Sequence, residues 1–207
     1  IKSNFEIDLN DIHVTSRKKN KKAEKRETNL KNNDSDKKSI FILGDSMIKH
    51  LQGWDIANEF ENKHKIYVRP FLSATVQSMF DYVKPSMREN PNHVIIHAAT
   101  NDIPSDKKSE SIAQDMIHLA KKIRSKDCSV AISSIVPRND KKSWSIKANE
   151  VNRTLEEMCK ELGLDFVNND NINPKKLLNN GKLHLNTKGT KKLRSNFIYH
   201  IKKVLSS

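Results

Sequence analysis

Residues 39–46 read SIFILGDS, a stretch in which four apolar residues are followed at once by Gly-Asp-Ser. A continuous apolar run containing β-branched and aromatic residues is typical of a strand buried on both faces of a sheet. Glycine and aspartate favour a turn directly after such a strand. The stretch therefore predicts a central, buried strand that ends at a serine, with residues 47–50 turning into a helix whose N-terminus would favour an anion at that serine.

Four more apolar runs of similar length follow along the chain, and each is rich in β-branched or aromatic residues. With the first run, they predict strands at residues 39–43, 65–69, 93–98, 129–135 and 164–167. The segments between them carry apolar side chains at helical spacing, which predicts helices within 76–87, 112–123, 148–162 and 193–205.

Strands that alternate with helices favour right-handed crossovers and a parallel sheet covered on both faces. The expected fold class is therefore α/β, a three-layer α/β/α flavodoxin-like sandwich with a five-stranded parallel sheet. In such sheets, the functional crevice lies at the carboxyl ends of the strands. Residues that directly follow strands are therefore the first candidates for a site.

Composition divides the chain into residues 1–38 and a domain at 39–207. Segment 17–38 holds ten basic and four acidic residues, a net charge of +6, and its only apolar residues are Ala23 and Leu30. Such a segment is expected to be disordered, because it cannot bury enough surface to offset the entropy of ordering. The apolar residues scattered through 1–16 fit either the end of a preceding element or a docking strand.

The charge of the whole chain, +13 for 38 basic and 25 acidic residues, favours polyanionic partners such as nucleic acid or acidic lipid surfaces. We expect the basic segment 17–38 to bind nucleic acid without sequence preference. Only two cysteines are present, and no secretory signal or transmembrane run is seen. An intracellular setting, cytoplasmic or nuclear, is expected, and the oligomeric state is open.

Three polar residues follow strands or precede the last helix in an order that suits acyl transfer. Ser46 ends the first strand, Asn101 follows the third, and His184 lies just before the final helix. A serine nucleophile, an amide donor for an oxyanion and an imidazole base are what ester hydrolysis needs. Each has a structural alternative: serine and aspartate cap helices, asparagine makes turns, and a lone histidine is usually structural.

The order and the amino-acid sequence of the motifs around these three residues resemble those of the SGNH (GDSL-type) hydrolases. GDS at 44–46, ATND at 99–102 and LHLNTKG at 183–189 are similar to blocks I, III and V of that family, over roughly 39–205. Residues 68–79, 81–86 and 182–193 further resemble SGNH-type domains in open reading frames of invertebrate retrotransposon-like elements. The resemblance implies a serine esterase-like domain acting on small acyl or acetyl esters.

The resemblance also implies roles for individual residues. Ser46 would be the nucleophile, His184 the general base, and the N–H groups of Ser46 and Ser73 with the Asn101 amide the oxyanion hole. Ser73 stands where the family has a glycine in block II, and Ala99 replaces the glycine of the third block.

The largest departure is Gly181, which occupies the position of the aspartate that orients the histidine. Loss of that carboxylate lowers kcat about 10⁴-fold in serine proteases. A Ser-His dyad, in which a backbone carbonyl orients His184, is one replacement. The side chains that could take that role are Asn179, Asn180, Asp102 and Asp170. Asp45 is read as a turn-stabilising residue rather than a catalytic carboxylate.

The sequence is therefore compatible with two functions. The first is a serine ester hydrolase with impaired activity, and its alternative is a catalytically inactive SGNH-like assembly or nucleic-acid-associated module of a mobile-element protein. No cofactor is expected. No metal is expected either, because the other histidines show no metal-like sequence spacing with cysteine or carboxylate.

Overall fold

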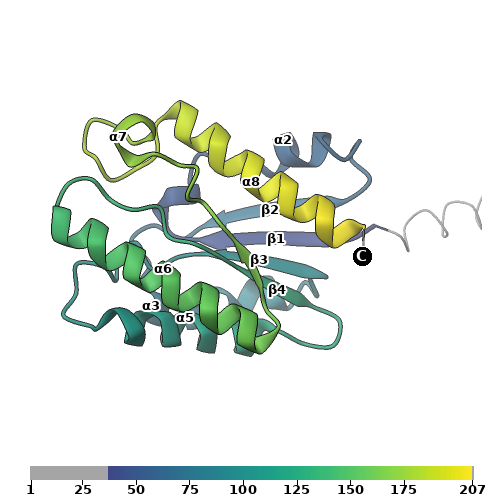
Figure 1. Cartoon of the computed structure of the whole chain (residues 1–207). Coiled ribbons are helices and arrows are strands. Elements are labelled where there is room, and N and C mark those ends of the chain that lie inside the picture. Colours follow the sequence, from purple (N-terminus) through teal and green to yellow (C-terminus); the bar gives the residue numbers. More distant parts are fainter. Residues whose placement is uncertain (1–36, 207) are drawn as a thin grey trace, which may run out of the picture. The chain divides into compact units, whose positions relative to one another are not determined.

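Five strands pair in parallel in the order β2-β1-β3-β4-β5 in the computed structural model, which describes residues 37–206 (Figure 1). The strands are β1 (Ser39–Gly44), β2 (Lys65–Pro70), β3 (His93–His97), β4 (Ser129–Ser133) and β5 (Asp165–Val167). All five strands expected from the sequence are present, and the α/β sandwich is confirmed. The chain order reverses at β1 and β3, which places a topological switch point beside the end of β1.

The register of the sheet brings the ends of β1, β2 and β3 to one edge. Gly44 pairs with Pro70 of β2 on one side and with His97 of β3 on the other. Because the strands are parallel, the residues after each of them leave the sheet side by side. The loops that begin at Asp45, Phe71 and Ala98 therefore start as neighbours.

Alternate side chains of β1 point into two separate cores. Phe41 and Leu43 belong to a core with residues of α3 (Val76–Tyr82), α5 (Ser109–Ile123) and α6 (Lys142–Leu162), whereas Ile40 and Ile42 pack with residues of α2 (Gly53–Asn58) and α8 (Thr187–Leu205). Figure 1 shows the same division, with α2, α7 (Pro174–Leu177) and α8 on one side of the sheet and α3, α5 and α6 on the other. Burial on both faces explains why β1 has no polar residue between Ile40 and Leu43.

Three long helices are found where apolar spacing predicts them. They are α5 (Ser109–Ile123), α6 (Lys142–Leu162) and α8 (Thr187–Leu205). The helix expected within 76–87 is divided into α3 (Val76–Tyr82) and α4 (Lys84–Met87). Pro85 lies at the start of α4, and a proline there cannot donate the amide hydrogen that a continuous helix requires.

Three short helices carry no periodic signal in the sequence. They are η1 (Ser46–Ile48), a single 3-10 turn, α2 (Gly53–Asn58) and α7 (Pro174–Leu177). Each is held by tertiary packing rather than by its own propensity, as expected for helices of less than two turns. Two of them are part of the candidate site or adjoin it: η1 begins with Ser46, and α7 precedes the loop that holds His184.

Some expectations fall on residues that the structure does not describe. Residues 1–36 lie outside the described part, so the expected disorder and nucleic-acid binding of segment 17–38 remain predictions. Among the described helices, none combines the length and apolarity that a membrane span requires.

Candidate active site

The turn after β1 is built around a glycine that allows close contact with β3. A Cβ atom on Gly44 would lie 2.2 Å from the carbonyl oxygen of His97, so a larger residue would push the two strands apart. The amide of Asp45 donates to the same carbonyl at 3.1 Å, and the amide of Phe71 donates to the carbonyl of Gly44 at 2.7 Å. The ends of β1, β2 and β3 are thus fastened together.

The side chain of Asp45 joins two loops of the site. Its Oδ1 accepts from the amide of Met47 at 2.9 Å and caps η1, and its Oδ2 accepts from the amide of Thr100 at 3.1 Å. The capping role therefore belongs to Asp45, and Ser46 is the first residue of the turn that Asp45 caps. The reading of Asp45 as a turn-stabilising residue is supported by these contacts.

A longer helix after Ser46 was expected, and the structure corrects this. The 3-10 turn η1 ends at Ile48, and the next helix begins only at Gly53. A three-residue turn has no substantial macrodipole, so helix-dipole stabilisation of an anion at Ser46 is not available. Stabilisation of an oxyanion must come from individual N–H groups.

Complete burial changes the acidity of Asp45. Burial raises the pKa of its carboxyl from 3.8 to about 6, against the lowering effect of the hydrogen bonds from Met47 and Thr100. The group is fully enclosed and has no access to substrate. Its task is to hold the turn that carries Ser46 against the loop that carries Asn101.

Two residues in the other loops have the backbone conformation that normally selects glycine. Ser73, after β2, has φ 60°, and Ala99, after β3, has φ 78°. These are the two positions at which the resemblance to SGNH hydrolases predicts glycine. Ser73 and Ala99 therefore adopt a backbone conformation that suits glycine although each carries a side chain. The resulting strain lowers the stability of the fold by about 1–2 kcal/mol at each position.

Asn101 and Asp102 connect the loop after β3 to the loop after β2. The Asn101 amide donates to the carbonyl of Ala74 at 2.9 Å, and Oδ2 of Asp102 accepts from the amide of Val76 at 3.0 Å, at the start of α3. Asn101 is half-buried, whereas Asp102 is buried. The Asp102 carboxylate is thus already hydrogen-bonded to the first residue of α3.

His184 lies in a tight loop between α7 and α8. Leu178 and Leu185 form an antiparallel bridge across the loop, and the carbonyl of His184 accepts from the amide of Asn179 at 2.7 Å. Asn186 then caps α8 by accepting from the amide of Gly189 at 2.9 Å.

Glycine 189 is needed for steric reasons. A Cβ atom on Gly189 would lie 2.1 Å from the carbonyl oxygen of Leu177, the last residue of α7. The Asn186 side-chain amide also donates to the carbonyl of Leu178 at 3.0 Å. The polar side chain of Asn186 in the LHLNTKG segment thus bonds to the backbone, and the ring of His184 does not.

The imidazole of His184 has no orienting partner on Nδ1. This atom is buried and makes no hydrogen bond to any residue within 37–206. Two carboxylates considered from the sequence are engaged elsewhere: Asp102 with the amide of Val76, and Asp170 with the side chain of Asn168 at 2.9 Å. Gly181 is therefore not compensated by a carboxylate in the described part of the chain.

The surroundings of His184 favour the neutral ring. Burial lowers the pKa of the His184 imidazole, and the nearby positive charges of Lys49, His50 and Arg138 lower it further. Lys49 and His50 come three and four residues after Ser46, so the His184 loop lies within electrostatic range of the turn that carries the serine. Sequence patterns gave no sign of this cationic environment, because its members come from separate loops.

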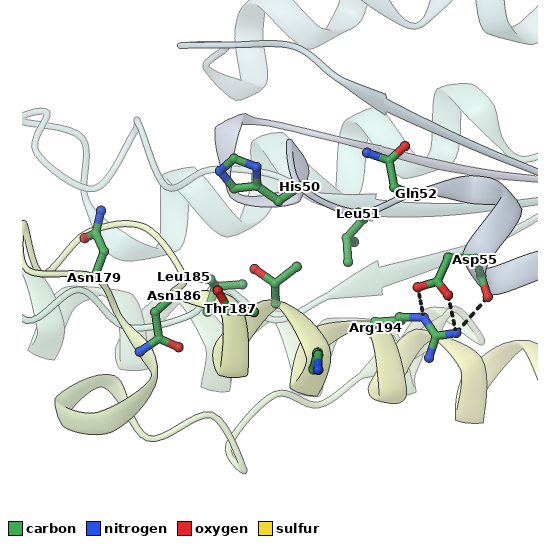
Figure 2. A pocket seen from close by; sticks show the side chains of 11 residues that line it. His50, Leu51, Gln52, Asp55, Asn179, Leu185, Asn186, Thr187 and Arg194 are labelled. Atoms are coloured by element: carbon green, nitrogen blue, oxygen red, sulfur yellow. Dashed lines mark hydrogen bonds and ion pairs between the residues drawn. The ribbon is translucent and has the colours of Figure 1, made fainter.

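A pocket of about 580 Å³ adjoins the His184 loop (Figure 2). Its walls come from the segment after η1, from α2 and from the start of α8, and its lining includes His50, Leu51, Leu185 and Thr187. At one end, Arg194 forms an ion pair with Asp55 at 2.6 Å. Ser46 and Asn101 are not among the lining residues, so the pocket lies beside the candidate site.

The structure thus ties the loops of Ser46, Ser73 and Asn101 together at one edge of the sheet and leaves the ring of His184 without a bond on Nδ1. The hydrogen bonds from Thr100 to Asp45 and from Val76 to Asp102 that make this connection were not predicted.

Comparison with protein families gives one match. The model of the GDSL-like lipase/acylhydrolase family matches residues 43–192, which includes the turn at Ser46, the loop of Asn101 and His184. No curated protein sequence matches the chain.

Solved structures with the same fold include several bacterial enzymes. A GDSL-like lipase from Bacteroides thetaiotaomicron has a TM-score of 0.67 at 17% identity, covering 81% of this chain and 89% of that one. A lipase/acylhydrolase from Enterococcus faecalis has a TM-score of 0.68 at 15% identity, covering 80% and 96%. A psychrotrophic esterase from Pseudoalteromonas sp. has a TM-score of 0.64 at 20% identity, covering 82% and 99%. These similarities describe a shared fold.

Proposed function

Because the chain belongs to the GDSL-like lipase/acylhydrolase family, we propose that it is a slow serine hydrolase of small acyl or acetyl esters, in which Ser46 and His184 act as a dyad. The observation that carries this proposal is the position of Ser46. Asp45 takes over the capping of η1 and the link to Thr100, so no helix cap requires the Ser46 hydroxyl. Ser46 and Asn101 each lie one residue from that link.

In the proposed reaction, Oγ of Ser46 bonds to the acyl carbon while its proton passes to Nε2 of His184. The carbon–oxygen bond to the alcohol then breaks, and the alcohol leaves with the proton from the imidazole. A water molecule, deprotonated by the same ring, attacks the acyl-enzyme and releases the acid. The proton returns to Ser46.

Three donors are proposed for the oxyanion: the N–H groups of Ser46 and Ser73, and the amide of Asn101. The Asn101 amide has two hydrogens, and one is given to the carbonyl of Ala74. The second is proposed to face the substrate. A single such donor is worth about 10²- to 10³-fold in kcat.

Slow turnover is expected because His184 has no carboxylate partner among residues 37–206. Without that group the imidazole is held neither in one tautomer nor in one orientation, and the cation formed during the reaction is not stabilised. The resulting loss is about 10⁴-fold. Oxyanion stabilisation alone leaves a residual acceleration of about 10³- to 10⁴-fold over water, which an ester assay detects.

A second candidate function is a binding or assembly module of a mobile-element protein that keeps this fold without turnover. The unpartnered Nδ1 of His184 favours it, as do the side chains present at Ser73 and Ala99. This candidate predicts that the family site residues have no effect on ester hydrolysis.

The two candidates are separated by the hydrolysis of p-nitrophenyl acetate by the full chain. The hydrolase proposal predicts a rate above background that falls to background in Ser46→Ala and drops at least tenfold in His184→Ala. Ser125→Ala, an exposed serine at the end of α5, serves as the matched control and should behave as the parent protein. Equal rates in all four proteins would reject the hydrolase and leave the non-catalytic module.

A further inference from the structure

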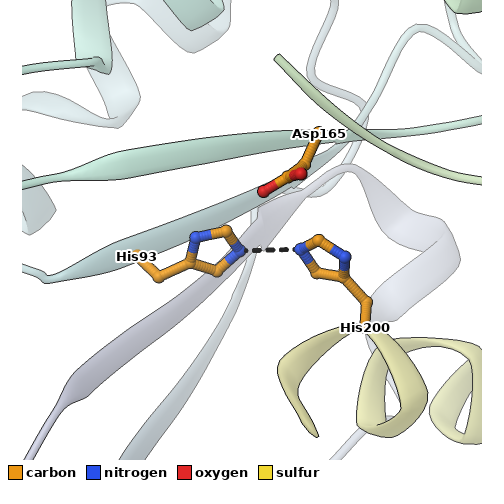
Figure 3. A group of neighbouring side chains, drawn as sticks. All are labelled: His93, Asp165 and His200. Carbon is orange, nitrogen blue, oxygen red and sulfur yellow. Dashed lines mark hydrogen bonds between the residues drawn. The ribbon is translucent and has the colours of Figure 1, made fainter. Parts of the chain in front are cut away.

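Three potential metal ligands lie together at the edge of the sheet opposite the candidate active site (Figure 3). His93 is the first residue of β3, Asp165 is the first residue of β5, and His200 lies on α8. Their nitrogen and carboxylate oxygen atoms all lie within 4.8 Å of one another. The residues are 72 and 35 positions apart in the chain, so sequence spacing gives no sign of the cluster.

The sheet register explains why these residues converge. His93 pairs with Ser129 of β4, and Asp165 pairs with Ala131 of the same strand. His93 and Asp165 are therefore the first residues of the two strands that flank β4, and the small Ala131 of β4 lies beside Asp165. Helix α8 crosses this face, where the ring of Phe197 contacts His97 and, one turn later, His200 reaches His93.

We propose that His93, Asp165 and His200 bind a divalent transition-metal ion of the zinc class. Two imidazole nitrogens and a carboxylate oxygen are a ligand set that zinc accepts in proteins, with bonds of about 2.0–2.2 Å. In a tetrahedron with such bonds, neighbouring ligand atoms lie about 3.3 Å apart. The two Nε2 atoms of His93 and His200 lie 3.0 Å apart, already close to that spacing.

A hydrogen bond behind His93 favours the tautomer that a metal requires. The Nδ1 atom of His93 lies 2.7 Å from Oγ of Ser129, and the Ser129 hydroxyl itself donates to the carbonyl of Asn92 at 3.4 Å. With its proton used in this way, Oγ accepts from Nδ1–H of His93. The lone pair on Nε2 is thereby directed toward His200, as in metal sites whose histidines are oriented by a second hydrogen bond.

Burial and exposure divide the cluster in a way that suits a metal site. His93 and His200 are buried, whereas Asp165 is exposed. The carboxylate therefore offers an entry route from solvent, and the two rings offer a protected, preformed pair of nitrogens. Three protein ligands leave a fourth tetrahedral position for water. A bound ion would connect β3, β5 and α8, and it should stabilise the fold.

The test is a titration of the metal-stripped, tag-free full chain with Zn²⁺ by calorimetry, and with Co²⁺ by its d–d absorption. One Zn²⁺ per chain and a rise in Tm are expected, since a ligand that binds only the folded state stabilises it. Asp165→Asn removes the exposed carboxylate with little change in shape, and it should weaken binding at least about tenfold and alter the Co²⁺ spectrum. Ser129→Ala should weaken binding about 10- to 100-fold, the usual effect of losing such a hydrogen bond.

His200→Ala should abolish the site, and His118→Ala is the matched control. His118 is an exposed histidine on α5, which packs on the other face of the sheet, so its removal should leave both affinity and spectrum unchanged. Parent-like Zn²⁺ affinity in both Asp165→Asn and His200→Ala would overturn the proposal. So would the absence of saturable binding by the parent protein, and His93 and His200 would then be a hydrogen-bonded structural pair.

Discussion

At the scale of single residues, the site is defined by which polar groups have structural tasks and which do not. Asp45, Asp102 and Asn186 each accept a backbone hydrogen bond that holds a loop or caps a helix. Nδ1 of His184, in contrast, is buried without any partner within the described residues. That atom is the weak point of the proposed dyad, and it is also where activity can be restored.

We predict that Gly181→Asp raises kcat for p-nitrophenyl acetate by at least about tenfold, because a carboxylate near Nδ1 would orient the ring and stabilise its cation. The change is sterically feasible. The nearest atom to an added Cβ at Gly181 is the Asn179 side-chain oxygen at 3.4 Å, an ordinary contact, and the backbone there is not in the left-handed region. Gly181→Asn is the uncharged control and should give a smaller gain.

The same substitution should change the pH dependence. Burial and neighbouring cations lower the pKa of His184 from its ordinary 6.5, so in the parent protein the base loses its proton at a lower pH than an ordinary histidine does. A carboxylate favours the protonated ring and raises its pKa. The acidic limb of kcat/KM should therefore lie at higher pH in Gly181→Asp than in the parent. An unmoved limb together with an unchanged kcat would show that residue 181 does not communicate with the base.

Asp45 should leave a signature in stability. Its pKa is about 6 in the folded protein and about 3.8 when unfolded, so the folded state holds the proton more tightly. Its contribution to stability is complete below about pH 4 and is lost as the pH rises through about 6, a change of about 3 kcal/mol. Urea unfolding of the parent and of Asp45→Asn across this range should show that decline only in the parent. A pH-independent difference between the two would contradict it.

At the scale of elements, the strands and long helices could be predicted because burial imposes a periodic pattern. Strand β1 is apolar because it is covered on both faces, and α5 places its apolar residues at helical spacing against the sheet. The break between α3 and α4 was missed, although Pro85 marks it in the sequence. Elements α2 and α7 were missed, and the helix expected after Ser46 is only the short turn η1, because helices this short follow from tertiary contacts and carry no period.

The loop after β2 offers a test of backbone strain. Ser73 has φ 60°, so Ser73→Gly should stabilise the protein by up to about 1 kcal/mol and should raise kcat by opening the oxyanion hole. Ser125→Gly is the control, since Ser125 does not have a positive φ and glycine there makes the unfolded chain freer, which should destabilise the protein by about 0.4–1 kcal/mol. Urea unfolding measures both effects. Equal losses of stability at the two positions would contradict strain at Ser73.

At the scale of the whole molecule, the order of Ser46, Asn101 and His184 along the chain predicts that they share one edge of the sheet, and the loops of Ser46 and Asn101 do begin there. The metal-ligand cluster could not be predicted in the same way. His93, Asp165 and His200 are brought together by strand register and by the path of α8, and neither is encoded in local spacing. Only the structure shows that Nδ1 of His184 has no partner within the described residues, because the sequence left both Asp102 and Asp170 as candidates.

The net charge of +6 in segment 17–38 leads to a prediction about the full chain. Replacing lysines 18, 19, 21 and 22 by glutamine should weaken binding to single-stranded RNA and reduce its salt dependence, by up to about 0.7 in the log–log slope for each lost phosphate contact. Replacing the exposed lysines 121, 126, 175 and 176 is the matched control. Equal losses from both variants, measured by fluorescence anisotropy at two salt concentrations, would place binding elsewhere.

In the proposed mechanism, His184 activates Ser46 as a nucleophile without the help of a carboxylate. The most direct measurement is covalent labelling of the full chain by a fluorophosphonate ester, followed by intact mass and peptide mapping. We expect one adduct per chain, located on Ser46. It should form at least tenfold more slowly in His184→Ala and faster in Gly181→Asp. An adduct at another residue, or labelling of Ser46 at the same rate in His184→Ala, would contradict it.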